Sequence, residues 1–153
     1  SNSKKIANSA IIYSMLRVPP KKNVVFDQKQ AVKFEGDTGP YQLYTYARIN
    51  SLLKKSNSGS VNPKLVNEYE LDLIKHLSKF PSISLKSIKN KKTNLVPNYC
   101  AELCQKFNSY YSQNIIISDD LNLTKHRIGI SKLVKQVISN CMFIMGIETI
   151  QEM

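Results

Sequence analysis

The feature that most constrains the fold is the spacing of apolar side chains, which recur every three or four residues through most of the sequence. Since an α-helix has about 3.6 residues per turn, this spacing places the apolar side chains on one helical face. No stretch shows the strict alternation of apolar and polar residues that is typical of a β-strand. The sequence therefore predicts an all-α fold, a bundle in which each helix buries one stripe of side chains.

Proline, glycine and capping residues divide this pattern into helices. Asp27 and Asn62 have the short polar side chains that accept hydrogen bonds at helix starts, and Pro63 suits a first turn. Gly146 suits the left-handed conformation that ends many helices. We predict helices over 5–17, 27–34, 40–55, 63–80, 82–89, 97–111 and 124–145, with a polar linker over 56–60.

Three of these helices have a clear inward-facing stripe. In the helix over 63–80 the stripe consists of Val66, Tyr69, Leu73, Leu77 and Phe80. In the helix over 97–111 it consists of Cys100, Leu103, Cys104, Phe107 and Tyr111. In the last helix it consists of Ile130, Val134, Val137, Cys141 and Ile144. We expect these side chains to pack together in the core of the bundle.

The chain is strongly basic, with 22 Lys and Arg against 11 Asp and Glu among 153 residues, a net charge of +11. Such an excess on one domain indicates a polyanionic partner, because each phosphate contact releases bound counterions. The alternatives are a merely solubilising basic surface or an anionic membrane. No stretch opposes a broad apolar face to a lysine-rich one, and no apolar run approaches the roughly 20 residues that cross a bilayer.

The sequence lacks the residue patterns of a catalytic centre or a metal site. No glycine-rich loop follows a strand, and no serine or cysteine has an identifiable base. Cys100 and Cys104 share a helical face, Cys141 stands alone, and His76 and His126 are isolated. We therefore expect no bound metal and three buried thiols, as in a cytoplasmic protein.

Eight tyrosines are interleaved with the basic residues. Tyr41, Tyr44 and Arg48 are three and four residues apart, so they line one helical face. Aromatic rings beside an arginine form a surface on which unstacked RNA bases stack. The alternative is that these tyrosines pack between helices with their hydroxyls hydrogen-bonded.

Residues 34–49, which read FEGDTGPYQLYTYARI, resemble the signature of the arginyl-tRNA synthetases. In that family Phe-Glu-Gly, Asn or Asp, and Thr-Gly-Pro-Tyr lead into a helix bearing Gln-Tyr and then Arg. Shorter similarities extend over 6–13, 25–27, 80–81, 99–103, 107–111 and 145–153. Two stretches depart from the family pattern. Residues 150–153 stand where the family often ends in Pro-Glu-Arg-Met, and the stretch between Phe80 and Pro97 is unusually rich in Lys and Ser.

The resemblance implies how the chain is organised. Residues 4–35 would be a helix and linker leaving the catalytic domain, and 36–153 a helical anticodon-binding domain of the class I synthetase type. Independently of the resemblance, we interpret residues 1–3 as the remnant of a purification tag. The parent enzyme would join arginine to its tRNA with ATP and Mg²⁺. The two signatures that hold ATP are missing, so this fragment would contain no catalytic residue and bind no cofactor. We expect it to be monomeric and cytoplasmic, with tRNA(Arg) and the missing catalytic domain as partners, and without a membrane.

The resemblance also implies which residues bind RNA. All arginine codons share a central G, so every arginine tRNA has C in the middle of its anticodon. Arg48 would donate hydrogen bonds to this base and Tyr111 would stack on it, with Tyr41 or Tyr44 against neighbouring bases. Met153 would close the pocket.

Each of these roles has an alternative. Arg127 would contact phosphates, but a salt bridge between helices is the alternative for this residue. Arg48 could be a structural arginine, and Met153 a frayed end. For the whole chain, the alternative is a helical protein-interaction module with incidental charge.

If the chain lacks the ATP site, it cannot activate arginine. We expect ATP–pyrophosphate exchange in the presence of arginine to stay at the level of a control without protein. Exchange above that level would contradict the assignment of this chain to a part of the enzyme without the ATP site.

Overall fold

The computed structural model describes residues 1–56 and 58–152, and within these ranges it contains helices and connecting segments but no strand. The helices are α1 (Asn2–Leu16), α2 (Gln28–Ala31), α3 (Gly39–Lys55), the 3-10 turn η1 (Pro63–Leu65), α4 (Glu68–Leu77), α5 (Phe80–Lys89), α6 (Leu95–Gln113) and α7 (Leu121–Met145). The predicted all-α fold is confirmed.

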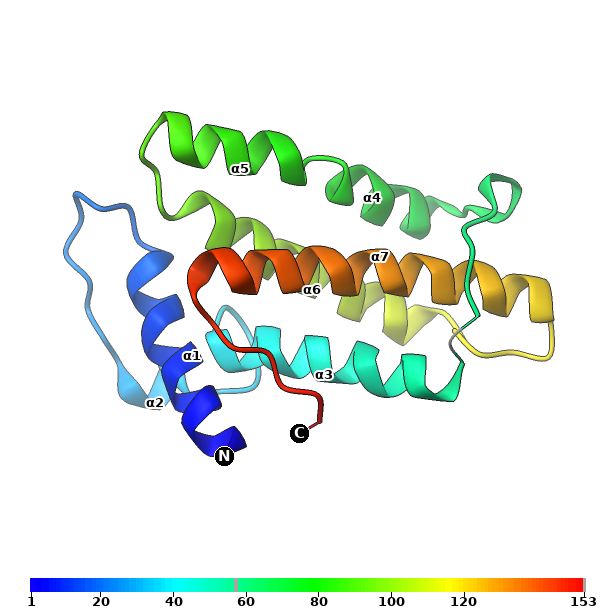
Figure 1. Cartoon of the computed structure of the whole chain (residues 1–153), viewed down its shortest axis with the longest axis horizontal. Helices are drawn as coiled ribbons and strands as arrows, with labels where there is room; N and C mark the ends of the chain where they lie inside the picture. Colours follow the sequence, from blue (N-terminus) through cyan, green and yellow to red (C-terminus); the bar gives the residue numbers. More distant parts are fainter. Residues whose placement is uncertain (57, 153) are drawn as a thin grey trace.

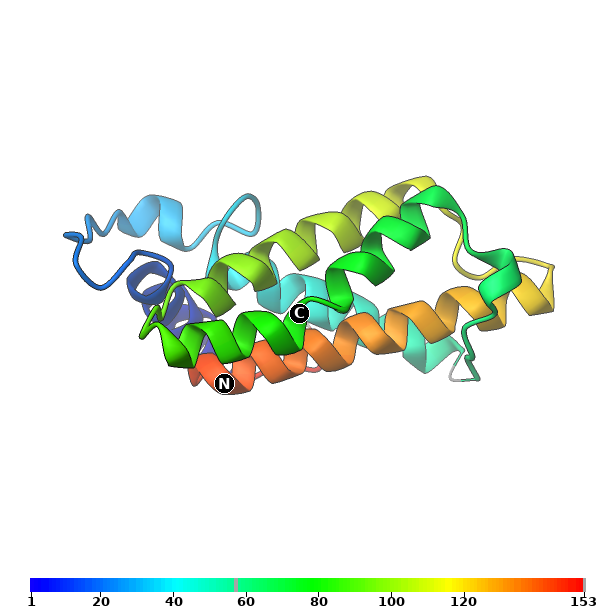
Figure 2. The same ribbon diagram turned by 90° about the horizontal axis from the view of Figure 1, so that it is seen from above.

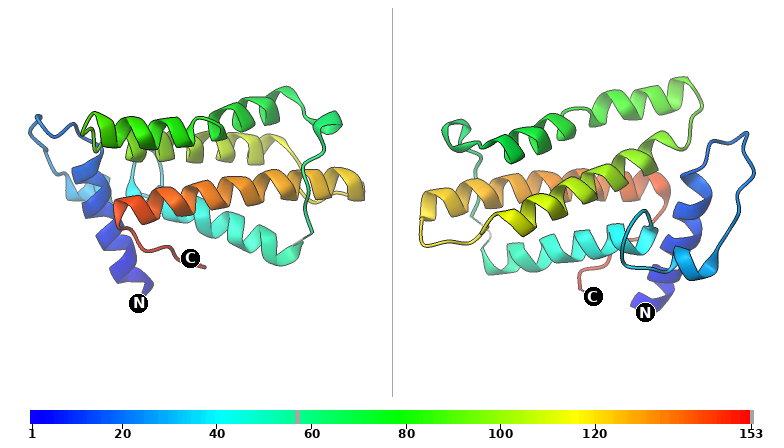
Figure 3. Two further views of the ribbon diagram at one scale, coloured as in Figure 1. Left: turned by 45° about the horizontal axis from the view of Figure 1, so that its top comes forward. Right: turned by 180° about the vertical axis from the view of Figure 1, so that it is seen from behind.

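The long helices α3, α6 and α7 run lengthwise, and each packs against the other two (Figure 1). Helices α4 and α5 follow one another along the top of the bundle in Figure 1, which is the side nearest the viewer in Figure 2, and α1 crosses α3 at one end of the bundle. After α7 the chain returns past α1 and along α3, where the Asn50 side-chain amide donates to the carbonyl of Gln151 at 2.9 Å. Helices α3 and α6 pack side by side, and both are visible when the bundle is seen from behind (Figure 3, right).

The helix boundaries follow from local chemistry. The Thr38 hydroxyl accepts from the backbone N–H of Tyr41 at 3.1 Å and starts α3. The Asp120 carboxylate accepts from the backbone N–H groups of Asn122 and Leu123 and starts α7. Gly146 ends α7 with φ +72°, the left-handed conformation predicted for it.

The predicted helix over 63–80 is wrong in its length. Its first residues form the 3-10 turn η1, and Val66 is extended before Asn67 starts α4 with a reciprocal capping box to Glu70. Pro81 lies in the first turn of α5 instead of ending the preceding helix. The helix predicted over 27–34 is also shorter, because the Thr38 hydroxyl donates to the carbonyl of Lys33 at 2.6 Å and holds the chain in a bend.

The predicted core is largely confirmed, with three exceptions. Tyr111, predicted on the inner side of its helix, is 37% exposed, and the adjacent Tyr110 is buried instead. Tyr69 is 50% exposed because the stripe of α4 that faces the bundle runs through Glu70, Leu73 and His76. Ile144 is 52% exposed in the last turn of α7. The three cysteines are free and buried, as expected. By length and composition α7 could cross a bilayer, but half of its apolar window is buried in the bundle, as in the core helix of a globular protein.

Close contact between two helix backbones depends on Gly39. A Cβ atom at this position would lie 2.2 Å from the carbonyl oxygen of Ser9 in α1. No side chain fits there, so the glycine lets α1 cross directly over the start of α3. This crossing fixes where α3 begins and therefore where its side chains face.

A buried carboxylate joins α4, α6 and α7. Glu70 is fully buried, and its carboxylate accepts from the backbone N–H of Asn67 at 2.9 Å and the Tyr110 hydroxyl at 3.2 Å. The Arg127 Nε–H lies 3.4 Å from the same carboxylate. His126 Nδ1 accepts a backbone N–H at 3.0 Å, so the His126 proton lies on Nε2, 3.1 Å from Glu70. Burial alone would raise the pKa of Glu70, but these hydrogen bonds outweigh it and hold the pKa below its usual range.

We expect Glu70→Gln to lower the free energy of unfolding by about 3 kcal/mol near neutral pH, because it leaves the mostly buried Arg127 without its counter-charge. Since the pKa of Glu70 is lowered on folding, its stabilisation is present above the unfolded-state value of about 4.3 and is lost as pH falls below it. Urea unfolding from pH 7 to pH 3 measures both effects. The control is Glu68→Gln, an exposed residue in the same first turn, for which we expect a loss below about 1 kcal/mol. Equal losses in the two variants would contradict this role of Glu70.

Candidate nucleic-acid interface

Helices α3 and α6 bring together the aromatic and cationic residues that the sequence analysis selected. Tyr41, Tyr44 and Arg48 lie on one face of α3, as predicted, and Tyr111 faces them from the last turns of α6. The guanidinium carbon of Arg48 lies 4.6 Å from the ring centroid of Tyr44 and 5.1 Å from that of Tyr111. Arg48 is therefore held between two tyrosine rings by cation–π contacts.

Asn108, one turn before Tyr111, completes this arrangement. Arg48 Nη1 donates to Asn108 Oδ1 at 2.5 Å, and Arg48 Nη2 donates to the Tyr44 hydroxyl at 2.5 Å. The Asn108 amide nitrogen donates to the Tyr41 hydroxyl at 2.9 Å and to Thr45 Oγ1 at 2.8 Å. We call Tyr41, Tyr44, Arg48, Asn108 and Tyr111 the arginine clamp.

Sequence reasoning missed Asn108 as a functional residue. Two signals were available: its place in the family-like stretch 107–111, and its spacing of three residues from Tyr111, which puts both on one face of α6.

The arginine clamp is half-buried and open on one side. Tyr111 is 37% exposed, and Tyr41, Tyr44, Arg48 and Asn108 have intermediate exposure. Burial raises the pKa of Tyr41 despite the opposing hydrogen bond from Asn108, so the Tyr41 hydroxyl is protonated at neutral pH. A guanidinium has five N–H donors, and the clamp residues accept from two of them. The site thus offers a fixed cation, spare donors and an accessible ring to a flat polar ligand.

Arg127 lies in different surroundings. Besides Glu70, its guanidinium donates to the carbonyl of Ile115 at 2.7 Å and to Asn114 Oδ1 at 3.3 Å, and its side chain is 13% exposed. These contacts are those of the salt-bridge alternative, so the structure does not bring Arg127 into the arginine clamp. Its phosphate contact stays a prediction.

Met153 lies outside the described residues, so its predicted role also stays untested. The residues just before it are held against α3. Glu152 pairs with Lys54, and Gln151 is bound by Asn50. Asn50 is two residues from Arg48, which is about 200° around the helix at about 100° per residue. The C-terminal segment therefore follows a different face of α3 from the arginine clamp.

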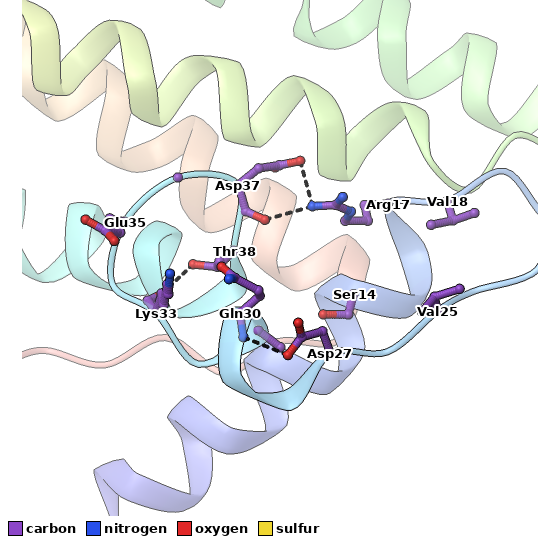
Figure 4. Close-up of a pocket in the computed structure, with 12 residues that line it drawn as sticks. Ser14, Arg17, Val18, Val25, Asp27, Gln30, Lys33, Glu35, Asp37 and Thr38 are labelled. Carbon is purple, nitrogen blue, oxygen red and sulfur yellow. Dashed lines mark hydrogen bonds and ion pairs between the residues drawn. The ribbon is translucent and has the colours of Figure 1, made fainter.

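A separate pocket of about 590 Å³ lies between the end of α1 and the segment that contains α2 (Figure 4). Most of the residues that line it are polar, and Arg17 bridges to Asp37 across it at 2.9 Å. Across residues 1–56 and 58–152, no group of three or more His, Cys, Asp or Glu side chains is placed to hold a metal ion. The arginine clamp is the better candidate for a binding site, because its rings and cation converge on one exposed surface.

The bundle has the architecture of the helical domain of class I synthetases. The arginyl-tRNA synthetase of Thermus thermophilus superposes with a TM-score of 0.94 and 26% identity, over 99% of this chain and 27% of that one. That of Plasmodium falciparum superposes with a TM-score of 0.87 and 25% identity, over 99% and 28%.

A family model described as the DALR anticodon binding domain matches residues 42–153. The chain belongs to this family. Among its relatives, the arginine–tRNA ligase of Borrelia duttonii is 37% identical over 97% of this chain and 26% of its own length. That of Clostridium acetobutylicum is 34% identical over 99% and 28%. The resemblance noted in the sequence is confirmed, and the chain spans about a quarter of the length of these relatives.

We expect Asn108→Ala to lower the free energy of unfolding by about 1–3 kcal/mol, because it removes three side-chain hydrogen bonds between α3 and α6. Asn108→Asp should cost less than Asn108→Ala, since its carboxylate still accepts from Arg48. Ser109→Ala, at the exposed neighbouring position, is the control and should change stability by less than about 0.5 kcal/mol. Chemical denaturation compares the three variants, and equal values for Asn108→Ala and Ser109→Ala would show that the hydrogen bonds do not stabilise the bundle.

Proposed function

We propose that this chain recognises the anticodon loop of tRNA(Arg) as part of an arginine–tRNA ligase. The observation that carries the proposal is the arginine clamp, in which Arg48 is fixed between the rings of Tyr44 and Tyr111 while Tyr111 remains partly exposed. Family membership and the names of the relatives support it. The active site of the ligase, with ATP and Mg²⁺, would lie in the rest of the enzyme.

The chemistry of the clamp suits a cytosine that has left the loop stack. Along its pairing edge, cytosine presents two acceptors and one donor. The spare N–H groups of Arg48 would donate to the acceptors, and a tyrosine hydroxyl or a backbone carbonyl would accept from the exocyclic amine. The Tyr111 ring would stack on the base, an interaction that contributes about 1–3 kcal/mol in single-strand binding. Tyr41 and Tyr44 would contact neighbouring bases.

The proposed second partner is the catalytic domain of the same enzyme. Helix α1 leaves Ile11 and Met15 about half exposed, and Phe26 and Phe34 are 41% and 49% exposed in the segment that follows. These side chains lie on α1 and on the segment that packs against it, and several large exposed apolar residues in one region are typical of a surface that another protein covers. We assign this surface to the catalytic domain, and we propose that the chain by itself is monomeric and that the protein is cytoplasmic.

The test compares a transcribed tRNA(Arg) with a variant changed only at the middle anticodon base. Arg48→Lys keeps the charge but loses the planar fork of donors. We expect it to narrow the difference in binding free energy between the two RNAs by about 1–3 kcal/mol, the range for a good bidentate base contact.

The matched control is Arg17→Lys, which makes the same chemical change at an exposed arginine outside the clamp. Binding isotherms for both RNAs and thermal unfolding of each variant are needed. If Arg48→Lys weakens both RNAs equally, Arg48 contacts phosphate and does not read the base. If wild type does not distinguish the two RNAs, the proposed anticodon recognition is wrong.

A further inference from the structure

The segment from residue 73 to residue 101 concentrates positive charge and has no acidic residue within it. It contains six lysines and no Asp or Glu, although the whole chain has 11 acidic residues. The six lysines, which lie on α4, on α5 and in the turns beside α5, are all exposed: Lys75, Lys79, Lys86, Lys89, Lys91 and Lys92. The arginine clamp uses none of them.

None of these six lysines forms an ion pair with another described residue. The cations that do so are elsewhere, as in the pairs Lys5–Glu148, Lys54–Glu152 and Lys106–Asp72. Surface lysines on a chain of this composition are usually interspersed with acids of opposite sign. Here the field of α5 and its turns is uniformly positive, which attracts an anion with many charges.

The turn after α5 holds two of these lysines in a defined position. The backbone N–H of Lys92 donates to the carbonyl of Ser87 at 3.0 Å, and that of Lys91 donates to the carbonyl of Ile88 at 3.2 Å. The Ser87 hydroxyl also donates to the Lys92 carbonyl at 2.8 Å. The paired backbone bonds are those of a Schellman motif, which normally has glycine at its left-handed residue.

That left-handed residue is Lys91, with φ +51°, the single non-glycine residue with positive φ in the described ranges. A lysine in this conformation is strained where glycine would not be. The sequence thus retains a charged side chain at an exposed position that favours glycine. An outlier of this kind suggests a function for the side chain.

The turn that holds Lys91 and Lys92 lies at one end of α6, and the arginine clamp lies at the other. The turn precedes the first residue of α6, and Asn108 and Tyr111 lie in its last two turns. At about 1.5 Å per residue, the helix separates Leu95 from Asn108 by roughly 20 Å. Along one nucleic-acid strand, with phosphates about 3.4 Å apart per step, this is the length of several nucleotides. An RNA whose loop is in the clamp can therefore place its stem beside the turn.

We propose that Lys86, Lys89, Lys91 and Lys92, the α5 lysine turn, bind the phosphate backbone of the stem of the same RNA whose loop enters the arginine clamp. This inference rests on the proposed function. Lysine is a compact point charge without a planar fork, so it contacts phosphates without reading bases. The turn therefore contributes affinity and orientation, and the clamp contributes base recognition.

An anionic membrane fits this surface less well. Leu85 and Ile88 are exposed on α5, but this helix has ten residues and lacks the broad apolar face that buries an interfacial helix in lipid. The defined geometry of the Lys91–Lys92 turn, and its place directly before the helix that carries Asn108 and Tyr111 of the clamp, favour RNA.

The experiment uses a hairpin RNA with the anticodon stem and loop of tRNA(Arg), and the same loop as a single strand. The test variant is the triple Lys89→Gln, Lys91→Gln, Lys92→Gln. The control is the triple Lys55→Gln, Lys64→Gln, Lys125→Gln, which removes the same charge from exposed lysines elsewhere. We expect the test triple to weaken hairpin binding about tenfold and to reduce the slope of log K against log salt by about two, since each lost phosphate contact removes somewhat under one. Single-strand binding should change equally in both triples.

Equal weakening of hairpin binding by the two triples would overturn the proposal, because the effect would then be one of net charge. Unchanged hairpin binding by the test triple, with charge-dependent binding of wild type to phosphatidylserine vesicles, would overturn it in favour of a membrane. Hairpin binding too weak to measure in wild type would also overturn it. If wild type binds the hairpin but does not distinguish the middle base, the anticodon function fails, while the two triples still decide whether the turn contacts RNA.

Lys91→Gly separates the role of the side chain from its effect on folding. Glycine relieves the strained backbone, so we expect a melting temperature a few degrees above wild type together with weaker hairpin binding. A more stable variant with unchanged binding would show that Lys91 does not contact the RNA.

Discussion

The side-chain amide of Asn108 is the link on which the binding surface depends. It accepts from Arg48 and donates to Tyr41 and Thr45, so a single group on α6 fixes three side chains of α3. An amide does this without a charge. A carboxylate in its place would neutralise the guanidinium, whereas the amide orients Arg48 and leaves its positive charge available to a ligand.

The contrast with Arg127 shows how the same residue type serves another purpose. Arg127 contacts the buried carboxylate of Glu70, so its charge is compensated inside the bundle. That contact connects α7 to α4, and Tyr110 adds α6 through its hydroxyl. Tyr110 and Tyr111 are adjacent in sequence and about 100° apart around α6. Tyr110 faces this buried network, and Tyr111 faces the arginine clamp. Helix α6 therefore joins the stability of the core to the geometry of the exposed site.

Local signals in the sequence were sufficient for most of the fold. Apolar spacing located the helices, and Asp27 and Gly146 have the capping roles predicted for them. The division between η1 and α4 was missed because it depends on the reciprocal bonds of Asn67 and Glu70, which also turn Glu70 inward in place of Tyr69.

The site was harder to predict than the fold. Its α3 face could be derived from a spacing of three and four residues. The role of Asn108 could not, since Arg48 is 60 positions away and only the packing of α3 on α6 brings them together.

Arginines and lysines have different electrostatic roles in this chain: the arginines make fixed contacts, and the lysines carry most of the exposed surface charge. Only three of its 22 basic residues are arginines, and each connects two segments: Arg17 with Asp37, Arg48 with Asn108, and Arg127 with Glu70. Within the described ranges, Arg48 is the arginine that has no acidic partner.

The planar guanidinium of arginine suits fixed contacts between segments, while the strongly hydrated ammonium of lysine suits a mobile surface charge. The net charge of +11 is therefore carried mostly by lysines, which attract a polyanion over a wide area, and a single uncompensated arginine stands where the aromatic rings converge. In the proposed function, the lysines would supply affinity that salt weakens, and discrimination between bases would fall to the rigid site, whose geometry salt does not change.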